Sequence, residues 1–150
     1  LVGGCGAGRS DAADKPLPSR GAVLAHGLAM RPGRTAAAGT IGSTPVLVVP
    51  GLPAHALAVW HALVQPVLDR LSGHGQRRAI VRPLARKISS TIGFAEFALL
   101  KMDDDHWMPL ATGELPLGQI AAADAWAIVP ADSEGYPAGS LLGAFLFRNP

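Results

Sequence analysis

The sequence predicts an α/β unit followed by a mostly β unit. Two observations indicate the first unit: residues 45–49 (PVLVV) form a short apolar run, and residues 54–71 then change to a helical spacing of apolar side chains. A series of short strand-like runs after residue 76 indicates the second unit. With 150 residues, the chain has room for one compact domain or two small ones.

The first unit is expected to contain a strand, a tight turn and a helix. Residues 21–30 (GAVLAHGLAM) form a predicted strand that ends at the Pro and Gly of positions 32 and 33. The run 45–49 is typical of a strand buried on both faces, as in parallel sheets. In the helix predicted after it, Pro66 can bend the chain, since it lacks a backbone donor. The expected apolar stripe of this helix is Leu57, Trp60, Val64, Val67 and Leu71.

The boundary between the units is placed at residues 72–76 (SGHGQ), because two glycines with polar neighbours follow the helical pattern there. The predicted domains are therefore residues 1–73 and 76–148. Residues 115–124 can form a single helical turn in the second domain. The strand-like runs of that domain are 77–84, 94–102, 125–129 and 141–147.

Composition excludes several classes of protein. The chain is 49% hydrophobic and 16% charged, which favours a folded protein over a disordered one. The net charge is only +2, and no run of Lys and Arg is interleaved with aromatic residues, so a nucleic-acid-binding surface is not indicated. Cys5 is the single cysteine. An intramolecular disulfide is therefore excluded, and a reducing, cytoplasmic location is favoured.

A membrane segment is not indicated either. The uncharged stretch between Arg34 and Asp69 is interrupted by Gly and Pro, and its longest part without them is residues 54–65. A membrane-spanning helix needs roughly 20 apolar residues. The first residues have neither an initiating Met nor the pattern of a signal peptide, so the chain is interpreted as a piece of a longer protein.

The first candidate segment for chemistry is the opening loop, residues 3–11 (GGCGAGRSD). Glycines let the backbone approach an anion closely, and a carboxylate such as Asp11 can hold Mg²⁺ or orient a nucleophile. The loop lacks the Lys and Ser/Thr of a Walker loop and does not match the GxGxxG spacing. Taken alone, it also fits a flexible loop.

Two further segments are turns after the predicted strands. In the turn 31–34 (RPGR), Arg31 and Arg34 flank a rigid Pro-Gly pair, an arrangement that suits an anion but also fits a solvated basic turn. The turn 50–53 (PGLP) joins the apolar strand to the helix and can direct helix N–H groups at an anion, or serve structure only. The acidic run 103–105 is interpreted as the solvated tip of a hairpin.

Taken in order, these segments resemble the molybdopterin molybdenumtransferase (MoeA) family of molybdenum cofactor biosynthesis, whose eukaryotic relative is the C-terminal domain of gephyrin. The likeness rests on residues 3–11 (GGCGAGRSD), 30–35 (MRPGRT) and 49–56 (VPGLPAHA) and extends over nearly the whole chain. It implies the C-terminal half of a molybdopterin-binding (MogA-like) α/β domain followed by a small β-barrel-like domain.

The resemblance also implies a reaction and a site. The family inserts molybdate into adenylylated molybdopterin with the help of Mg²⁺ and releases AMP. Positive charge is needed there, because a doubly charged oxyanion must approach an anionic dithiolene and a phosphate. Asp11 falls at the family's metal and molybdate site, as catalytic residue and metal ligand. The implied cofactor-binding residues are Gly3, Gly4, Gly6, Arg31, Gly33, Arg34, Pro50, Gly51 and Pro53.

Some positions depart from the family pattern. Gly6 and His55 stand where the family has Ser, Leu52 stands where it has Asn, and Phe94 replaces an Arg. The alternatives are therefore a divergent, non-catalytic molybdopterin-binding protein or carrier that serves a molybdoenzyme, or a structural assembly module. In the family the site lies between subunits, so a homodimer is expected of the full-length protein, and this piece alone is not expected to be active.

Overall fold

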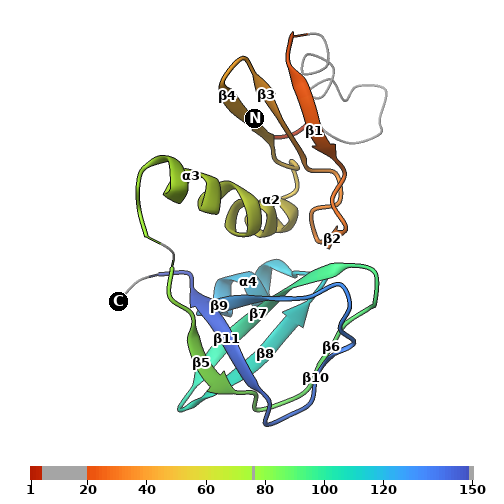
Figure 1. The fold of residues 1–150 in the computed structure, drawn as a ribbon. Helices are drawn as coiled ribbons and strands as arrows, with labels where there is room; N and C mark the ends of the chain where they lie inside the picture. The colour runs from red at the N-terminus through yellow and green to blue at the C-terminus, as the bar shows by residue number, and fades with distance from the viewer. Residues whose placement is uncertain (5–19, 76, 149–150) are drawn as a thin grey trace. The chain divides into compact units, whose positions relative to one another are not determined.

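The computed structural model describes residues 1–4, 20–75 and 77–148 (Figure 1). The chain divides into two compact units. The first unit comprises Leu1–Ala29 and Gly33–Gly73, and the second comprises Met30–Pro32 and His74–Pro150. No helix of the described ranges is long and apolar enough to cross a membrane.

The first unit contains an antiparallel sheet in the order β1-β3-β4. The strand predicted at 21–30 is shorter than expected, because Gly27 turns the chain with a φ of 81°. The Gly27 N–H donates to the Ala36 carbonyl at 2.9 Å, which closes this turn. The strands are β1 (Ala22–His26), β3 (Ala37–Ile41) and β4 (Thr44–Val48).

The prediction of a parallel strand buried on both faces is wrong for β4. This strand pairs with β3 antiparallel in a hairpin, and its first residues are exposed while Val48 is buried. A parallel contact occurs just beyond the strand, where an isolated bridge joins Val2 and Val49. The Gly3 N–H donates to the Val49 carbonyl, and the Val49 N–H donates to the Leu1 carbonyl, each at 2.8 Å.

The predicted helix is present but is not a regular α-helix. It consists of α2 (Pro53–Val59), a π-helical turn η1 (Trp60–Val64) and α3 (Gln65–Leu71). The wider turn lies directly before Pro66, which has no N–H and whose ring would crowd the carbonyl four residues earlier. The extra residue in this turn shifts the buried face. Trp60 and Leu71 are 44% and 65% exposed, and the buried side chains are Ala58, Val59, His61 and Val64.

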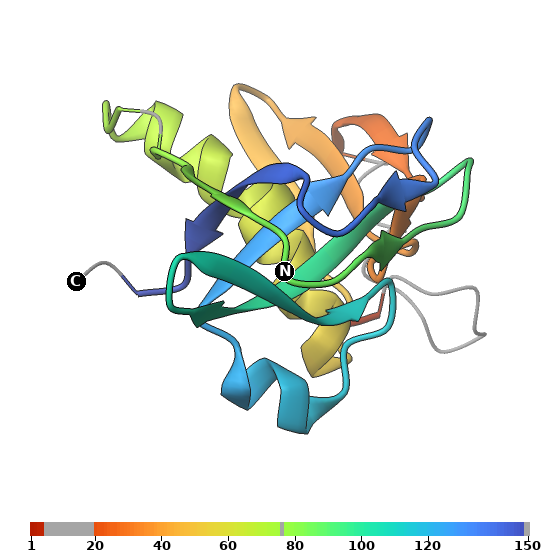
Figure 2. The same ribbon diagram turned by 90° about the horizontal axis from the view of Figure 1, so that it is seen from below.

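The second unit is mostly β, as predicted. Its large sheet has the order β2-β7-β9-β11-β5, with β8 also paired to β7, while β10 and β6 form a separate pair. All pairs are antiparallel except β2 with β7. Figure 2 shows these strands from a second direction, coloured mainly from green to blue. The elements are β2 (Met30–Arg31), β5 (Ile80–Pro83), β6 (Ile88–Ser89), β7 (Ala95–Asp103), β8 (His106–Thr112), α4 (Leu117–Ala122), β9 (Ala125–Val129), β10 (Gly135–Tyr136) and β11 (Leu141–Leu146).

Within residues 77–148, the sheet of the second unit does not form a closed barrel. The end of β5 reaches the beginning of β8 through an isolated bridge between Leu84 and Trp107, and the Ala85 N–H donates to the Trp107 carbonyl at 2.9 Å. This link is a single bridge and not a ladder. The predicted barrel-like form is therefore not confirmed.

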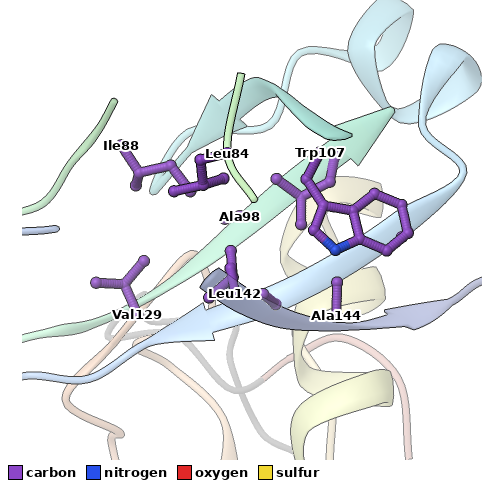
Figure 3. Packing of buried hydrophobic residues seen from close by; sticks show 10 residues of the cluster. Leu84, Ile88, Ala98, Trp107, Val129, Leu142 and Ala144 are labelled. Carbon is purple, nitrogen blue, oxygen red and sulfur yellow. The ribbon is translucent and has the colours of Figure 1, made fainter. Parts of the chain in front are cut away.

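The core of the second unit lies on one face of β7, β9 and β11 (Figure 3). Trp107 is its largest fully buried side chain, and its indole N–H donates to the Ile80 carbonyl at 3.3 Å. On the other face of these strands, Phe97 stacks on Trp126 with 5.1 Å between ring centroids. The buried residues of the core cluster are Leu84, Ile88, Ala98, Leu100, Trp107, Ala125, Ala127, Val129, Leu142 and Ala144.

Candidate functional site

Two of the predicted ligand-binding segments meet in the first unit. The Val2–Val49 bridge places Leu1–Gly3 beside the end of β4, and the backbone of Gly3 then approaches that of Gly51. A Cβ added to Gly51 would lie 3.5 Å from the Gly3 Cα, and one added to Gly3 would lie 3.9 Å from the Gly51 Cα. Gly3, the first residue of the opening loop, is therefore a neighbour of the turn after β4.

The backbone conformation at this place requires glycine. Gly3 and Gly4 have φ values of 82° and 71°, in the left-handed region that other residues rarely adopt. The Gly3 N–H already donates to the Val49 carbonyl, so what Gly3 offers an anion is a backbone that no Cβ shields. Pro50 is buried and anchors the turn, while Gly51 is exposed. The pair Gly3 and Gly51 thus forms a bare backbone surface that a phosphate can approach closely.

The turn continues into helix α2 without a polar cap. Pro53 is the first residue of the helix and Leu52 is its N-cap, with no side-chain hydrogen bond to the first turn. The Leu52 side chain is 63% exposed. An apolar side chain at this position can accept no hydrogen bond from the helix N–H groups, in contrast to Asn, Ser or Asp.

The Arg-Pro-Gly-Arg turn is ordered by its own backbone. Strand β2 ends at Arg31, and the Arg31–Pro32 peptide bond is cis. The Leu28 N–H donates to the Arg34 carbonyl, and the Ala36 N–H donates to the Gly33 carbonyl, each at 3.0 Å. Gly33 is buried with a φ of 126°, which a residue with a side chain would adopt only with strain.

Arg31 itself belongs to the second unit, whereas Gly33 and Arg34 belong to the first. Its guanidinium lies 3.8 Å from the Glu96 carboxylate and 4.1 Å above the centroid of the Phe94 ring. The sequence alone indicates a charge at Arg31 that is available to a ligand, and it reveals neither of these partners. A single glutamate inside the apolar run 95–100 is the signal that could have indicated a buried carboxylate in need of a cation.

The other predicted positions are placed as follows. Asp11 and Gly6 lie outside the described residues, so the metal assignment stays a prediction. Within residues 1–4, 20–75 and 77–148, no group of three His, Cys, Asp or Glu side chains could hold a metal ion. The acidic run 103–105 is exposed in the turn of the β7–β8 hairpin, as predicted.

The first unit also contains an apolar groove of about 530 Å³. His61 lies in its wall, with Nδ1 2.9 Å from the Gln65 side-chain oxygen. Of the predicted site residues that the structure describes, Pro53 is the one that lines it. The other lining residues are Leu1, Val2, Leu47, Val49, Ala56, Leu57, Trp60 and Val64.

Two known proteins with similar sequences carry names that refer to molybdopterin. A molybdopterin biosynthesis protein of Methanocaldococcus jannaschii is 24% identical over 99% of this chain, and molybdopterin molybdenumtransferase 1 of Mycobacterium tuberculosis is 26% identical over the same share. The resemblance to the MoeA family is confirmed. The present chain spans 36% and 38% of the lengths of these two relatives. No protein-family model matches it.

Solved structures agree with the sequence comparison. A molybdenum cofactor biosynthesis protein from Pyrococcus furiosus matches 83% of the MoeA-like chain, with a TM-score of 0.74 and 26% identity. The molybdopterin biosynthesis MoeA protein from Pyrococcus horikoshii matches 88% of it, with a TM-score of 0.72 and 28% identity. The chain covers 45% and 34% of these two structures.

Proposed function

We propose that this chain is the molybdopterin-binding part of a MoeA-like enzyme of molybdenum cofactor biosynthesis. The full-length protein would insert molybdate into adenylylated molybdopterin and release AMP. The observation that carries this proposal is the approach of Gly3 to Gly51, which brings together two of the segments on which the likeness to the family rests. The likeness to molybdopterin molybdenumtransferase 1 over 99% of the chain supports the same substrate.

Different residues would bind different parts of the substrate. The backbone of Gly3, Gly4 and Gly51 would receive the phosphate of the pterin, because no Cβ prevents its approach. Pro50 and Pro53 hold the turn beside it rigid. Arg31 and Arg34 would supply positive charge that offsets repulsion between molybdate and the anionic substrate.

Mg²⁺ is assigned to Asp11 by resemblance alone. The described residues contain no group of three His, Cys, Asp or Glu side chains that could hold it. Molybdate and molybdopterin are substrates in this proposal, and the homodimer and a molybdoenzyme partner remain proposals for the full-length protein.

Substitution of Gly3 tests the proposed phosphate site. In the full-length protein, Gly3→Val should weaken molybdopterin binding by about tenfold, since a side chain at positive φ displaces the backbone that faces Gly51. Gly42→Val is the matched control, because Gly42 also has a positive φ, 59°, but lies in the β3–β4 turn. Binding is measured by fluorescence titration and turnover by AMP release with molybdate. Equal effects of the two variants would reject the site.

A non-catalytic molybdopterin-binding protein is the second candidate. It is favoured by Leu52, the exposed N-cap of helix α2 that offers no side-chain hydrogen bond, where the family has Asn. Tight molybdopterin binding without AMP release would establish this candidate over the enzyme. Leu52→Asn should then improve AMP release if the lost side-chain hydrogen bond is the cause.

A further inference from the structure

A buried carboxylate lies beside the proposed anion-binding turn. Glu96 is in β7 and is only 5% exposed, which is rare for a glutamate. Its Oε2 accepts a hydrogen bond from the Thr91 N–H at 3.4 Å, and its Oε1 lies 3.8 Å from an Arg31 guanidinium nitrogen. A charge this deeply buried is stable only with a cation and hydrogen bonds beside it. Arg31 supplies the cation.

The backbone at Gly113 passes close to the Glu96 carboxylate and leaves no space for a side chain there. Gly113 follows β8, and a Cβ there would lie 2.7 Å from Oε1 of Glu96. In the parallel β2–β7 pair, Arg31 and Glu96 are register partners, so their side chains leave the backbone at the same level. The carboxylate therefore has a defined place from which its Oε1 faces one guanidinium nitrogen at 3.8 Å.

The opposite restraint on Arg31 is aromatic. The guanidinium carbon lies 4.1 Å above the centroid of Phe94, within the distance of a cation–π interaction. An arginine has five N–H donors in a planar fork, and a carboxylate on one edge with a ring on one face leaves other donors unused by these two contacts. The Arg31 side chain is 39% exposed, so this arginine is accessible from solvent.

We propose that Glu96 is a positioning residue that, together with the Phe94 ring, orients the Arg31 guanidinium toward an oxyanion of the pterin substrate. This inference rests on the proposed function, because it assumes that the turn of Arg31 binds the substrate. The benefit is entropic: an arginine held in one rotamer loses less freedom when an anion binds. Glu96 does not itself touch the ligand.

The negative charge of Glu96 could also have the opposite effect on ligand binding. A carboxylate that merely competes with the ligand for Arg31 would repel an anion, and its removal would strengthen binding. A positioning carboxylate gives the reverse result, because its removal releases the guanidinium. The sign of the change in affinity therefore separates the two roles.

A double-mutant cycle in the full-length protein tests the inference, with molybdopterin as the probe. The variants are Arg31→Ala, Glu96→Gln and the double variant, with the dissociation constant measured by fluorescence. We expect Glu96→Gln to weaken binding by about tenfold, and Arg31→Ala to cost much less in the Glu96→Gln background than in the wild type. Glu134→Gln, at an exposed carboxylate of the same unit, is the matched control and should leave the affinity unchanged.

If Glu96 had a purely structural role, Glu96→Gln would lower the stability of the protein, but it would not change the effect of Arg31→Ala on molybdopterin affinity. Thermal unfolding of each variant is therefore followed in parallel. Phe94→Leu keeps the carboxylate and removes only the ring, and it should weaken binding by a few-fold even if Glu96→Gln fails to fold. Unchanged or tighter binding in folded Glu96→Gln would overturn the inference. An unchanged affinity of Arg31→Ala would instead reject the proposed role of the turn in substrate binding, and with it the assumption on which the inference rests.

Discussion

The two units bury their large side chains to very different extents. Most of the largest fully buried side chains belong to the second unit: Trp107, Phe97, Leu84, Leu99, Leu100 and Val129. The first unit contributes Val48 and Val59 to the same group. One small core cluster among its described residues consists of Ala37 and Val48, with Val46 packed against them. Within residues 1–4, 20–75 and 77–148, the second unit therefore buries more large side chains than the first.

The unit with more buried large side chains is not the unit that contains the candidate phosphate site. Gly3 and Gly51 lie in the first unit, where backbone hydrogen bonds beside Val49 fix their place and few large side chains of the described residues are fully buried. Segments with little buried apolar area open at low free energy, which is common in ligand-binding loops. In contrast, β7 of the second unit is buried continuously from Glu96 to Leu100.

The largest effect is expected at the centre of the second core. Trp107→Ala removes a fully buried indole and its hydrogen bond to Ile80, and should lower the free energy of unfolding by about 3–5 kcal/mol. Urea denaturation followed by circular dichroism measures it. Trp60→Ala is the control in the first unit, where the side chain is 44% exposed, and should cost about 1 kcal/mol or less. Similar costs at the two positions would contradict the comparison.

A smaller effect is expected where the backbone approaches the buried carboxylate. Gly113→Ala places a Cβ 2.7 Å from Oε1 of Glu96 at a φ of 73°, so steric and conformational strain add. We expect a loss of about 2 kcal/mol in unfolding free energy. Gly139→Ala has the same kind of φ, 82°, with nothing within 4 Å, and should lose only about 1 kcal/mol. Calorimetry of both variants measures the two losses of unfolding free energy. Equal losses would show that the contact with Glu96 contributes nothing to the cost of Gly113→Ala.

An effect of about 1 kcal/mol is expected at the rim of the second core. Arg82 donates a hydrogen bond to the Asp104 carbonyl and lies 5.6 Å from the centroid of the Trp107 ring, with its side chain 24% exposed. Arg82→Ala removes the packing of its stem as well as these contacts. Asp105→Asn removes only a fully exposed partner 3.8 Å away and should leave the melting temperature unchanged. A large shift in that second variant would show that the ion pair matters more than the packing.

The sequence predicted the elements whose signals are local. The strand at 125–129 and the long strand near 94–102 were found because apolar and aromatic residues gather there between turn residues. Strand β8 was not among the predicted runs, because Pro109 interrupts its apolar residues and its place depends on pairing with β7. The antiparallel pairing of β4 was missed for a related reason: a short apolar run does not show which strand lies beside it.

The candidate site was predicted as separate segments and not as an arrangement. The glycines at 3, 4 and 51 were identified from their composition, but their approach depends on the Val2–Val49 bridge, which links residues far apart in the chain. The pairing of Arg31 with Glu96 has the same long-range origin, since the two are joined by the β2–β7 register. Spacing along a sequence carries no information about such tertiary pairs.

The smallest effect is expected in the helix of the first unit. Pro66 is exposed and follows the π-helical turn at Trp60–Val64. Pro66→Ala restores an N–H that can donate to the carbonyl of Ala62, worth about 0.5–1.5 kcal/mol, but it also frees the unfolded chain by about 0.4–1 kcal/mol. These terms nearly cancel.

We therefore expect unfolding free energy to rise by less than about 1 kcal/mol, with a small gain in helical circular dichroism. Pro45→Ala, at an exposed proline of β4, is a control for the unfolded-chain contribution. A loss of more than about 1 kcal/mol in Pro66→Ala would show that the π-turn, and with it the burial of Val59 and His61, depends on the proline ring.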